Sequence, residues 1–385
     1  MLPKKLQNKL DNRVTNNSLR TLENSNNLID FSSNDYLGLT TSKAVFYRAS
    51  EILKSHNLET NGATGSRLLS GNHKLYELAE QQIAQFHNTE SALLFNSGYD
   101  ANVGFFSSVP QRGDLILYDE LCHASIRDGI KMSDAKAYKF KHNNLKDLKR
   151  RCKVERNRNP DETSEIYVVT ESVFSMDGDQ PDLKELADFC TENNVYLIID
   201  EAHAFGVFGA RGEGLIQELA LENQVFARLI TFGKALGCHG ASILCNKKLK
   251  QYLVNFARSF MYTTALPPHG VATICSAYEA LEKFSAREQL HRNIALLQDK
   301  IAENNLQNFF ISSTSAIHSC VIPGNEKVKK VSEALLKEGF NVKPILSPTV
   351  PKGQERLRIC VHSFNTENNI FNLVRGLSIL LRKDV

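Results

Sequence analysis

The sequence predicts an α/β protein whose larger part contains a mostly parallel sheet. Apolar runs of strand length alternate with segments of helical periodicity through the centre of the chain, which is the pattern of parallel strands joined by crossover helices. Polar residues that could carry chemistry follow directly after several of these runs. With 385 residues, the chain is long enough for one large domain and a smaller one.

The individual elements follow from periodicity. Apolar residues recur at helical spacing from Leu75 to Phe86, and Pro181 marks the start of another helix whose apolar face runs from Leu183 to Cys190. Six buried strands are expected at 91–95, 115–118, 166–170, 195–199, 227–231 and 241–245.

The character of the chain changes after Pro267-Pro268. A long helical stretch through about Asn305 precedes a strand at 357–361, and Thr366 can cap a last helix. This pattern predicts a small α+β domain. The expected division is an N-terminal arm over 1–40, a large domain over 41–270 and a small C-terminal domain over 271–385.

Composition narrows the function classes. A net charge of +3 does not indicate that the protein binds nucleic acid. The basic stretch 146–158 is either a solvated helix face or a rim that assists the binding of an anionic substrate. The sequence has neither an apolar run of about 18 residues nor the apolar core of a signal peptide, so no membrane association is expected. Eight cysteines without a C-x-x-C pair suggest neither a metal site nor disulfides. We expect a cytoplasmic protein.

Lys234 and Asp200 form the most informative pair. Lys234 lies between glycines just after the strand at 227–231, and Asp200 ends the strand at 195–199 and is followed by Glu201-Ala202-His203. Pyridoxal phosphate needs a lysine that binds its aldehyde and a buried carboxylate that keeps its pyridine nitrogen protonated. Either residue alone is common in α/β proteins, but together they predict a pyridoxal phosphate site with Lys234 and Asp200 as catalytic residues.

Other candidate residues follow strand ends, where ligands bind in open α/β sheets. Gly98 opens a helix whose N-terminus suits a phosphate, although the segment could be an ordinary turn. His123 could stack on the cofactor or be a structural histidine, and His203 is close enough to Asp200 to reach the cofactor's phenolic oxygen. Ser175 is either a turn residue or a donor to that edge, and Tyr99 is either a structural residue or a cofactor contact.

Two further signals are weak. The segment Gly62 to Arg67 is glycine-rich, but it is not G-x-G-x-x-G and no strand leads into it, which argues against a nicotinamide-dependent oxidoreductase. Arg20 and Arg358 could each clamp a carboxylate with two hydrogen bonds, although for an isolated arginine a surface ion pair is the simpler interpretation.

Several motifs in one order resemble the α-oxoamine synthases, over about residues 19–381. They are Ser33 to Gly38, Gly65-Ser66-Arg67 with Ser70-Gly71, Thr170 to Asp179, Asp200 to His203, Thr231 to Lys234, Tyr262-Thr263-Thr264 and Pro348 to Pro351. The resemblance implies the fold type I architecture of aspartate aminotransferase and a homodimer with active sites at the interface. The sequence departs from many relatives at Cys238-His239, which puts the acyl-side contacts there in doubt.

The resemblance also implies residue roles. Lys234 would bind the cofactor, with Asp200 at the pyridine nitrogen, His203 near the phenolic oxygen and His123 stacked on the ring. Further cofactor contacts would be Gly98, Tyr99, Ser175 and Thr231, and Thr263 and Thr264 would approach the phosphate of the partner subunit. Substrate contacts would be Arg20, His123, Thr349 and Arg358, with Arg358 on the amino-acid carboxylate.

The implied reaction is a decarboxylative condensation of an amino acid with an acyl thioester. Phe232 and the segment Pro348 to Pro351 favour L-alanine and a pimeloyl thioester, of coenzyme A or acyl carrier protein, in biotin synthesis. Alternatives within the family are 2-amino-3-ketobutyrate ligase, which uses glycine and acetyl-CoA, 5-aminolevulinate synthase and serine palmitoyltransferase. A non-catalytic scaffold of the same fold is a further alternative.

Overall fold

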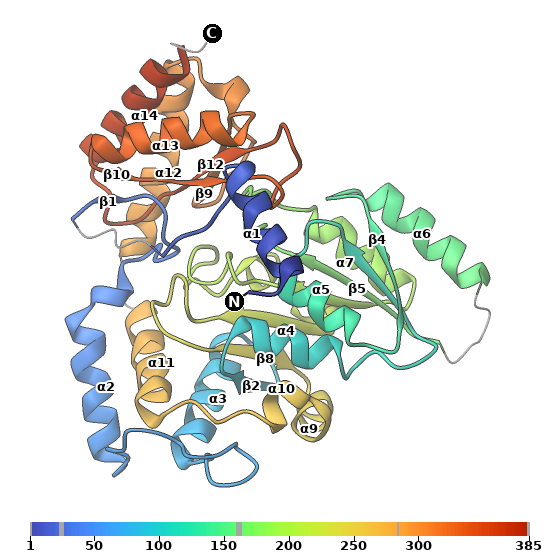
Figure 1. Cartoon of the computed structure of the whole chain (residues 1–385). Coiled ribbons are helices and arrows are strands. Elements are labelled where there is room, and N and C mark those ends of the chain that lie inside the picture. The colour runs from blue at the N-terminus through green and yellow to red at the C-terminus, as the bar shows by residue number, and fades with distance from the viewer. Residues whose placement is uncertain (1, 23–26, 159–163, 283–284, 383–385) are drawn as a thin grey trace. The chain divides into compact units, whose positions relative to one another are not determined.

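The computed structural model describes residues 2–22, 27–158, 164–282 and 285–382 and divides into two compact units (Figure 1). The larger unit comprises residues 37–175 and 180–287, and the smaller unit comprises residues 1–36, 176–179 and 288–385. None of the described helices is long and apolar enough to cross a membrane.

The larger unit is built on a sheet of seven described strands in the order β2-β8-β7-β6-β5-β3-β4. All strands run parallel except β8, which is antiparallel to its neighbours β2 and β7. The strands are β2 (Ser91–Phe95), β3 (Leu115–Asp119), β4 (Lys136–Phe140), β5 (Ile166–Glu171), β6 (Tyr196–Asp200), β7 (Ala227–Thr231) and β8 (Ala241–Cys245). The expected mostly parallel sheet is confirmed.

Helices cover both faces of this sheet (Figure 1). The helices described in the larger unit are α2 (Lys43–Ser55), α3 (Lys74–Phe86), α4 (Gly98–Phe106), α5 (Ala124–Lys131), α6 (Leu145–Arg158), α7 (Leu183–Glu192), α8 (Leu215–Glu218), α9 (Lys247–Phe256), α10 (Arg258–Met261) and α11 (Pro268–Leu281). In β3, Ile116 packs with α4 and α5, whereas Leu115 and Leu117 pack with α6 and α7. Because successive strand residues point to opposite faces, a strand covered on both sides must be apolar throughout, which explains the continuous apolar runs.

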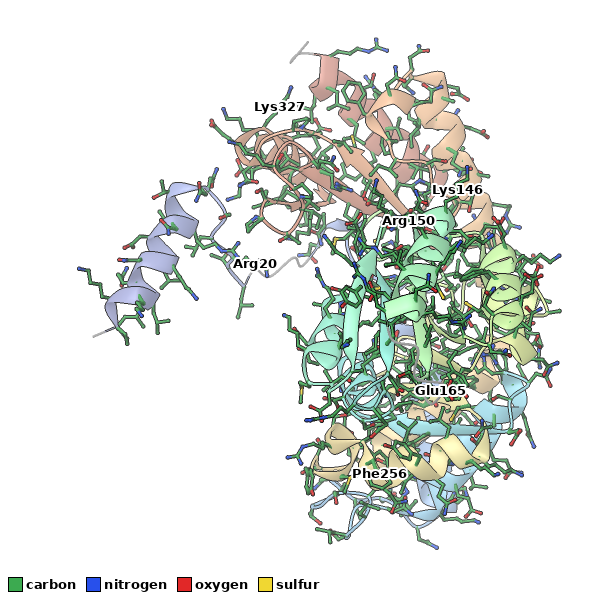
Figure 2. All side chains as sticks on the ribbon, turned by 90° about the vertical axis from the view of Figure 1, so that its right-hand side faces the viewer. Arg20, Lys146, Arg150, Glu165, Phe256 and Lys327 are labelled. Carbon is green, nitrogen blue, oxygen red and sulfur yellow. The ribbon has the colours of Figure 1, made fainter. Side chains whose placement is uncertain are left out.

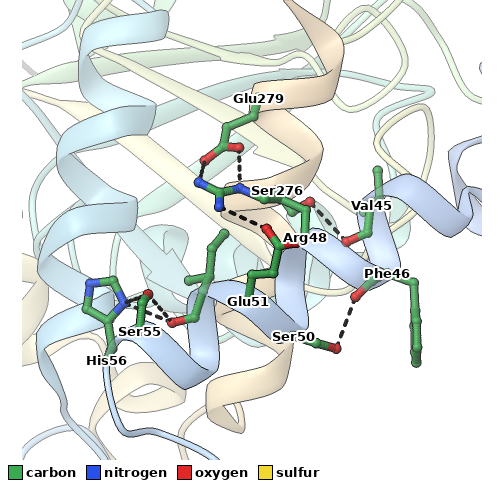
Figure 3. Close-up of polar contacts among 10 residues, drawn as sticks. Val45, Phe46, Arg48, Ser50, Glu51, Ser55, His56, Ser276 and Glu279 are labelled. Carbon is green, nitrogen blue, oxygen red and sulfur yellow. Dashed lines mark hydrogen bonds and ion pairs between the residues drawn. The ribbon is translucent and has the colours of Figure 1, made fainter.

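The helix α11 packs against α2 and α3, so the larger unit extends to Arg287, beyond the division expected at residue 270. Figure 3 shows two contacts between α2 and α11. Arg48 pairs with Glu279 through two hydrogen bonds of 2.8 and 3.1 Å, and the Ser276 hydroxyl donates to the Val45 carbonyl at 3.0 Å.

The helix α6 contains the basic stretch (Figure 2 labels Lys146 and Arg150). Part of its charge is compensated locally: Arg150 pairs with Asp147 at 2.6 Å and Arg158 with Glu155 at 3.1 Å. Most of its basic side chains are exposed, as expected for a solvated face.

The smaller unit contains a three-stranded antiparallel sheet in the order β11-β12-β9 and a parallel pair of β1 and β10. Its elements are α1 (Lys4–Thr15), β1 (Ile29–Asp30), α12 (Ala286–Glu303, whose first two residues cluster with the larger unit), β9 (Ile317–Val321), α13 (Asn325–Lys337), β10 (Phe340–Asn341), β11 (Lys343–Ile345), β12 (Arg356–Cys360) and α14 (Glu367–Arg382). The Thr366 hydroxyl caps α14 by accepting from the Asn369 N–H at 3.2 Å, as predicted.

Candidate active site

Lys234 and His203 meet at the carboxyl edge of the larger sheet. Lys234 lies in the turn after β7, and His203 lies three residues beyond the end of β6. Their side chains are hydrogen-bonded, with 2.7 Å between Lys234 Nζ and His203 Nε2. Lys234 is half-buried and His203 is buried, so the contact lies in a partly desolvated site. The two residues predicted at separate strand ends are therefore neighbours.

Asp200 is held by two donors. Its Oδ1 accepts from the Ala202 N–H at 3.0 Å, and its Oδ2 accepts from Asn102 Nδ2 at 2.9 Å. The carboxyl group is buried, with 5% of the residue exposed. Hydrogen bonds of this kind fix the orientation of a carboxylate. Sequence reasoning missed Asn102, which lies inside α4 and not at a strand end.

His123 begins α5 as its N-cap residue. The imidazole Nδ1 is 2.8 Å from Ser125 Oγ and accepts from the Ser125 backbone N–H at 3.3 Å. His123 is exposed as a residue, yet partial desolvation of its imidazole is the main factor that lowers its pKa. Asp200 opposes this shift and Lys234 adds to it.

Glu171 is a buried carboxyl group at the end of β5 that sequence reasoning also missed as a site residue. It lies opposite Asp200 in the register of β5 and β6, and it accepts from the His123 N–H at 2.7 Å. Burial raises its pKa to about 8, and the neighbouring Asp200 contributes, whereas Lys234 and the N–H groups of His123 and Ser175 lower it. The backbone N–H of Ser175 therefore lies near Glu171, at the same edge of the sheet.

The N-terminus of α4 lies against the end of β7. A Cβ atom at Gly98 would come 2.5 Å from Thr231 Cγ2, so this close approach requires glycine. The Thr231 hydroxyl is buried and has no hydrogen-bond partner among the residues that the structure describes. A hydroxyl without a partner beside a helix N-terminus fits an anionic group such as a phosphate.

Thr263 and Thr264 lie beside the same strand-to-helix connection. Asn96 Nδ2 donates to Thr263 Oγ1 at 3.1 Å and to the Thr264 carbonyl at 2.7 Å. Tyr99, in the first turn of α4, is exposed, and its hydroxyl donates to Asp128 Oδ2 at 2.6 Å.

The predicted substrate residues Arg20, Thr349 and Arg358 belong to the smaller unit (Figure 2 labels Arg20). Arg20 Nη2 donates to Thr349 Oγ1 at 2.9 Å, so two of the three are in contact although 329 residues separate them. Arg358 is half-buried and donates to Asn34 Oδ1 at 3.0 Å. Asn34 lies in the first of the motifs that carry the resemblance.

Comparison with known proteins identifies the family. The model of the aminotransferase class I and II family matches residues 26–377. An 8-amino-7-oxononanoate synthase of Emericella nidulans is 42% identical over 369 residues, which cover 92% of this chain and 90% of the relative. The chain belongs to this family. Its resemblance to the α-oxoamine synthases is confirmed, with the fold type I architecture.

Solved structures of family members share the fold across nearly the whole chain. A serine palmitoyltransferase from S. paucimobilis with bound PLP-myriocin aldimine has a TM-score of 0.88 at 26% identity, covering 99% of this chain and 97% of that one. An 8-amino-7-oxononanoate synthase from Francisella tularensis has a TM-score of 0.76 at 29% identity, covering 93% and 98%.

Proposed function

We propose that the protein is an 8-amino-7-oxononanoate synthase of biotin synthesis. It condenses L-alanine with a pimeloyl thioester: a bond forms between the alanine Cα and the thioester carbonyl carbon, the carbon–sulfur bond breaks, and the alanine carboxylate leaves as CO2. The observation that carries this proposal is the 42% identity to the Emericella nidulans enzyme over nine-tenths of both chains.

The cofactor is pyridoxal phosphate. When bound, it supplies a ring that withdraws electrons and so stabilises negative charge at the amino-acid Cα. The buried residues present suit this chemistry. Asp200, held by Asn102 and Ala202, would keep a proton on the pyridine nitrogen. Lys234 would provide the amine that holds the cofactor's aldehyde carbon and would act as the general base for the Cα proton.

His203 and the α4 N-terminus complete the cofactor contacts that we propose. His203 already contacts Lys234 Nζ and would hydrogen-bond the phenolic oxygen. Gly98 and Thr231 would hold the phosphate, because the Thr231 hydroxyl has no partner within the described part of the chain and the helix N-terminus favours an anion. Tyr99 and Ser175 are the further contacts that we infer from the family resemblance.

We propose that four residues contact the substrates: Arg20, His123, Thr349 and Arg358. We assign Arg358 to the alanine carboxylate, because a guanidinium can hold a carboxylate through two charge-assisted hydrogen bonds. Arg20 and Thr349, which contact each other, would bind the acyl thioester, and His123 would lie beside the reacting groups.

We also propose a cytoplasmic homodimer. The helix α1 has no buried residue and exposes Leu6, Leu10 and Val14 at helical spacing, an apolar stripe that a second copy could cover. In that dimer, Thr263 and Thr264 would approach the phosphate of the partner subunit. The eight cysteines are all free thiols, which suits a reducing compartment.

Serine palmitoyltransferase is the second candidate, because its structure has the higher of the two TM-scores, 0.88 against 0.76. The other family members, 2-amino-3-ketobutyrate ligase and 5-aminolevulinate synthase, catalyse the same class of reaction on other substrates. The hydrogen-bonded pair of Lys234 and His203 argues against a non-catalytic scaffold, since such a protein has no need of it.

A substrate panel tests this function. The purified protein with pyridoxal phosphate is given alanine, glycine or serine together with pimeloyl, acetyl, succinyl or palmitoyl thioesters of coenzyme A, and pimeloyl-acyl carrier protein. Thiol release and product mass are measured. We expect thiol release with alanine and a pimeloyl thioester, the mass of 8-amino-7-oxononanoate, and loss of both in Lys234→Ala. Preferred turnover of serine with palmitoyl-CoA, or of glycine with a short acyl thioester, would overturn the assignment.

A further inference from the structure

A chain of buried hydrogen bonds connects Asp200 to His123. Asn102 Nδ2 donates both to Asp200 Oδ2 at 2.9 Å and to Ser125 Oγ at 3.1 Å, and Ser125 Oγ lies 2.8 Å from His123 Nδ1. The two connecting residues are deeply buried: Asn102 is 2% exposed and Ser125 is fully buried. All four residues belong to the larger unit.

The direction of each hydrogen bond follows from Asp200. A carboxylate can only accept, so the amide of Asn102 must present its NH2 group to Asp200. The same NH2 group faces Ser125 Oγ, which therefore accepts the second hydrogen bond. The Ser125 hydroxyl must then place its own hydrogen elsewhere, because a buried donor without a partner is costly. The acceptor within reach is His123 Nδ1.

A second donor faces the same nitrogen. The Ser125 backbone N–H also points at His123 Nδ1, at 3.3 Å, and so uses the imidazole as the N-cap of α5. Two donors directed at one ring nitrogen require that nitrogen to carry a lone pair. The hydrogen of the neutral imidazole must then be on Nε2.

We propose that Asn102 and Ser125 are positioning residues that fix His123 as the neutral tautomer with its hydrogen on Nε2. Because Asp200 can only accept hydrogen bonds, Asn102 must donate to Ser125 and Ser125 must donate to His123. His123 Nδ1 is therefore an acceptor. His123 then presents a hydrogen-bond donor at Nε2, suited to an oxygen of a carboxylate or a thioester and unable to act there as a general base. The role of this Nε2 donor beside the cofactor rests on the proposed function, whereas the position of the hydrogen on the His123 ring does not.

The test is the tautomer state of His123 by nitrogen NMR on the full-length protein labelled with ¹⁵N-histidine, without cofactor and after reconstitution. The chain has 11 histidines, so the His123 signals are assigned by their loss in His123→Gln. Spectra are recorded at a pH where the imidazole is uncharged. We expect a protonated Nε2 and an unprotonated Nδ1 in the natural protein.

Asn102→Asp is the decisive variant, because it replaces the donor by an acceptor of nearly the same shape. The new carboxyl group would share a proton with Asp200 and accept from Ser125 Oγ, which would in turn accept from His123 and so move the ring hydrogen to Nδ1. We expect the ratio of the Nδ1–H to the Nε2–H tautomer to rise at least about 10-fold, the change that one net hydrogen bond of about 1.4 kcal/mol produces. Ser125→Ala, which removes only the hydroxyl, should raise the same ratio by a smaller factor.

Ser276→Ala is the matched control (Figure 3). It removes a serine hydroxyl that is equally buried and also hydrogen-bonded, between α2 and α11, and should leave the His123 tautomer unchanged. A protonated Nδ1 in the natural protein, or a ratio that stays the same in both Asn102→Asp and Ser125→Ala, would overturn the proposal. Because the spectra need no substrate, a wrong substrate assignment leaves this result interpretable.

Discussion

Glu171 is a buried carboxyl group whose charged neighbours include Asp200 and Lys234. It is 3% exposed, and its burial is the largest of the factors that raise its pKa from 4.5 to about 8. At neutral pH the folded protein therefore keeps Glu171 largely protonated, which avoids two adjacent negative charges at the ends of β5 and β6.

This shift predicts a pH-dependent stability. The folded-state pKa is raised above the unfolded value, so the contribution of Glu171 to stability is fully present below pH 4.5 and is lost as pH rises toward about 8. Glu171→Gln keeps a neutral group of similar shape and removes this loss. We expect the cofactor-free variant to gain about 2 kcal/mol or more in unfolding free energy relative to the natural protein between pH 5 and pH 8, measured by urea denaturation. If the unfolding free energies of the two proteins changed with pH in the same way, the raised pKa of Glu171 would be contradicted.

At the residue scale, the sequence was informative where chemistry coincides with the end of a strand. Lys234, His203, Asp200 and His123 could be selected in this way because each follows an apolar run. Asn102 has no such signal, since it lies within α4 among apolar residues such as Ala101 and Phe105. A polar side chain on an apolar helix was the available clue, and it does not reveal which acceptor the side chain meets.

At the scale of elements, strands with every residue buried were predictable and the largely exposed strand β4 was not. The runs at 91–95 and 241–245 match β2 and β8 residue for residue. The strand β4 was missed because it buries only Phe140, so its sequence lacks a continuous apolar run, whereas β2, at the opposite edge of the sheet, is buried throughout. The expected long helix after Pro268 is two helices, of which α11 ends at Leu281 and α12 begins at Ala286.

The contact between α4 and β7 gives a prediction at this scale. In Gly98→Ala, the new methyl group would overlap Thr231 Cγ2 and displace the start of α4 from the end of β7. If this junction binds the cofactor phosphate, we expect the dissociation constant for pyridoxal phosphate to rise about 10-fold, equivalent to one charge-assisted hydrogen bond. Titration of the cofactor-free protein, followed by absorbance, measures it.

Gly270→Ala is the matched control for this change. Gly270 lies in the first turn of α11, and an added Cβ there would meet Pro267 at an ordinary 3.8 Å. It should leave the affinity for the cofactor unchanged. Equal affinities of Gly98→Ala and the natural protein would place the phosphate elsewhere.

At the scale of the whole molecule, sequence order is a poor guide to the units. The N-terminal residues 1–36 cluster with residues 288–385, and residues 176–179 join them although the rest of their motif belongs to the larger unit. Local contacts explain the last case, because Arg356 pairs with Asp177 and the Ser319 hydroxyl donates to the Met176 carbonyl at 2.6 Å. Periodicity carries no information about such distant pairs. The family resemblance named Arg20 and Thr349 as separate substrate contacts, and their hydrogen bond to each other is seen only in the structure.

The central claim is that the folded chain gathers separate strand ends into one cofactor site in which Lys234 binds the cofactor. Borohydride reduction of the native holoprotein, followed by digestion and mass spectrometry, tests it directly, because reduction makes the bond between cofactor and lysine permanent. We predict a pyridoxyl group on Lys234 alone in the native protein, and labelling spread over several lysines when the chain is unfolded before cofactor and borohydride are added. A native protein labelled at another lysine, or as broadly as the unfolded chain, would contradict the account.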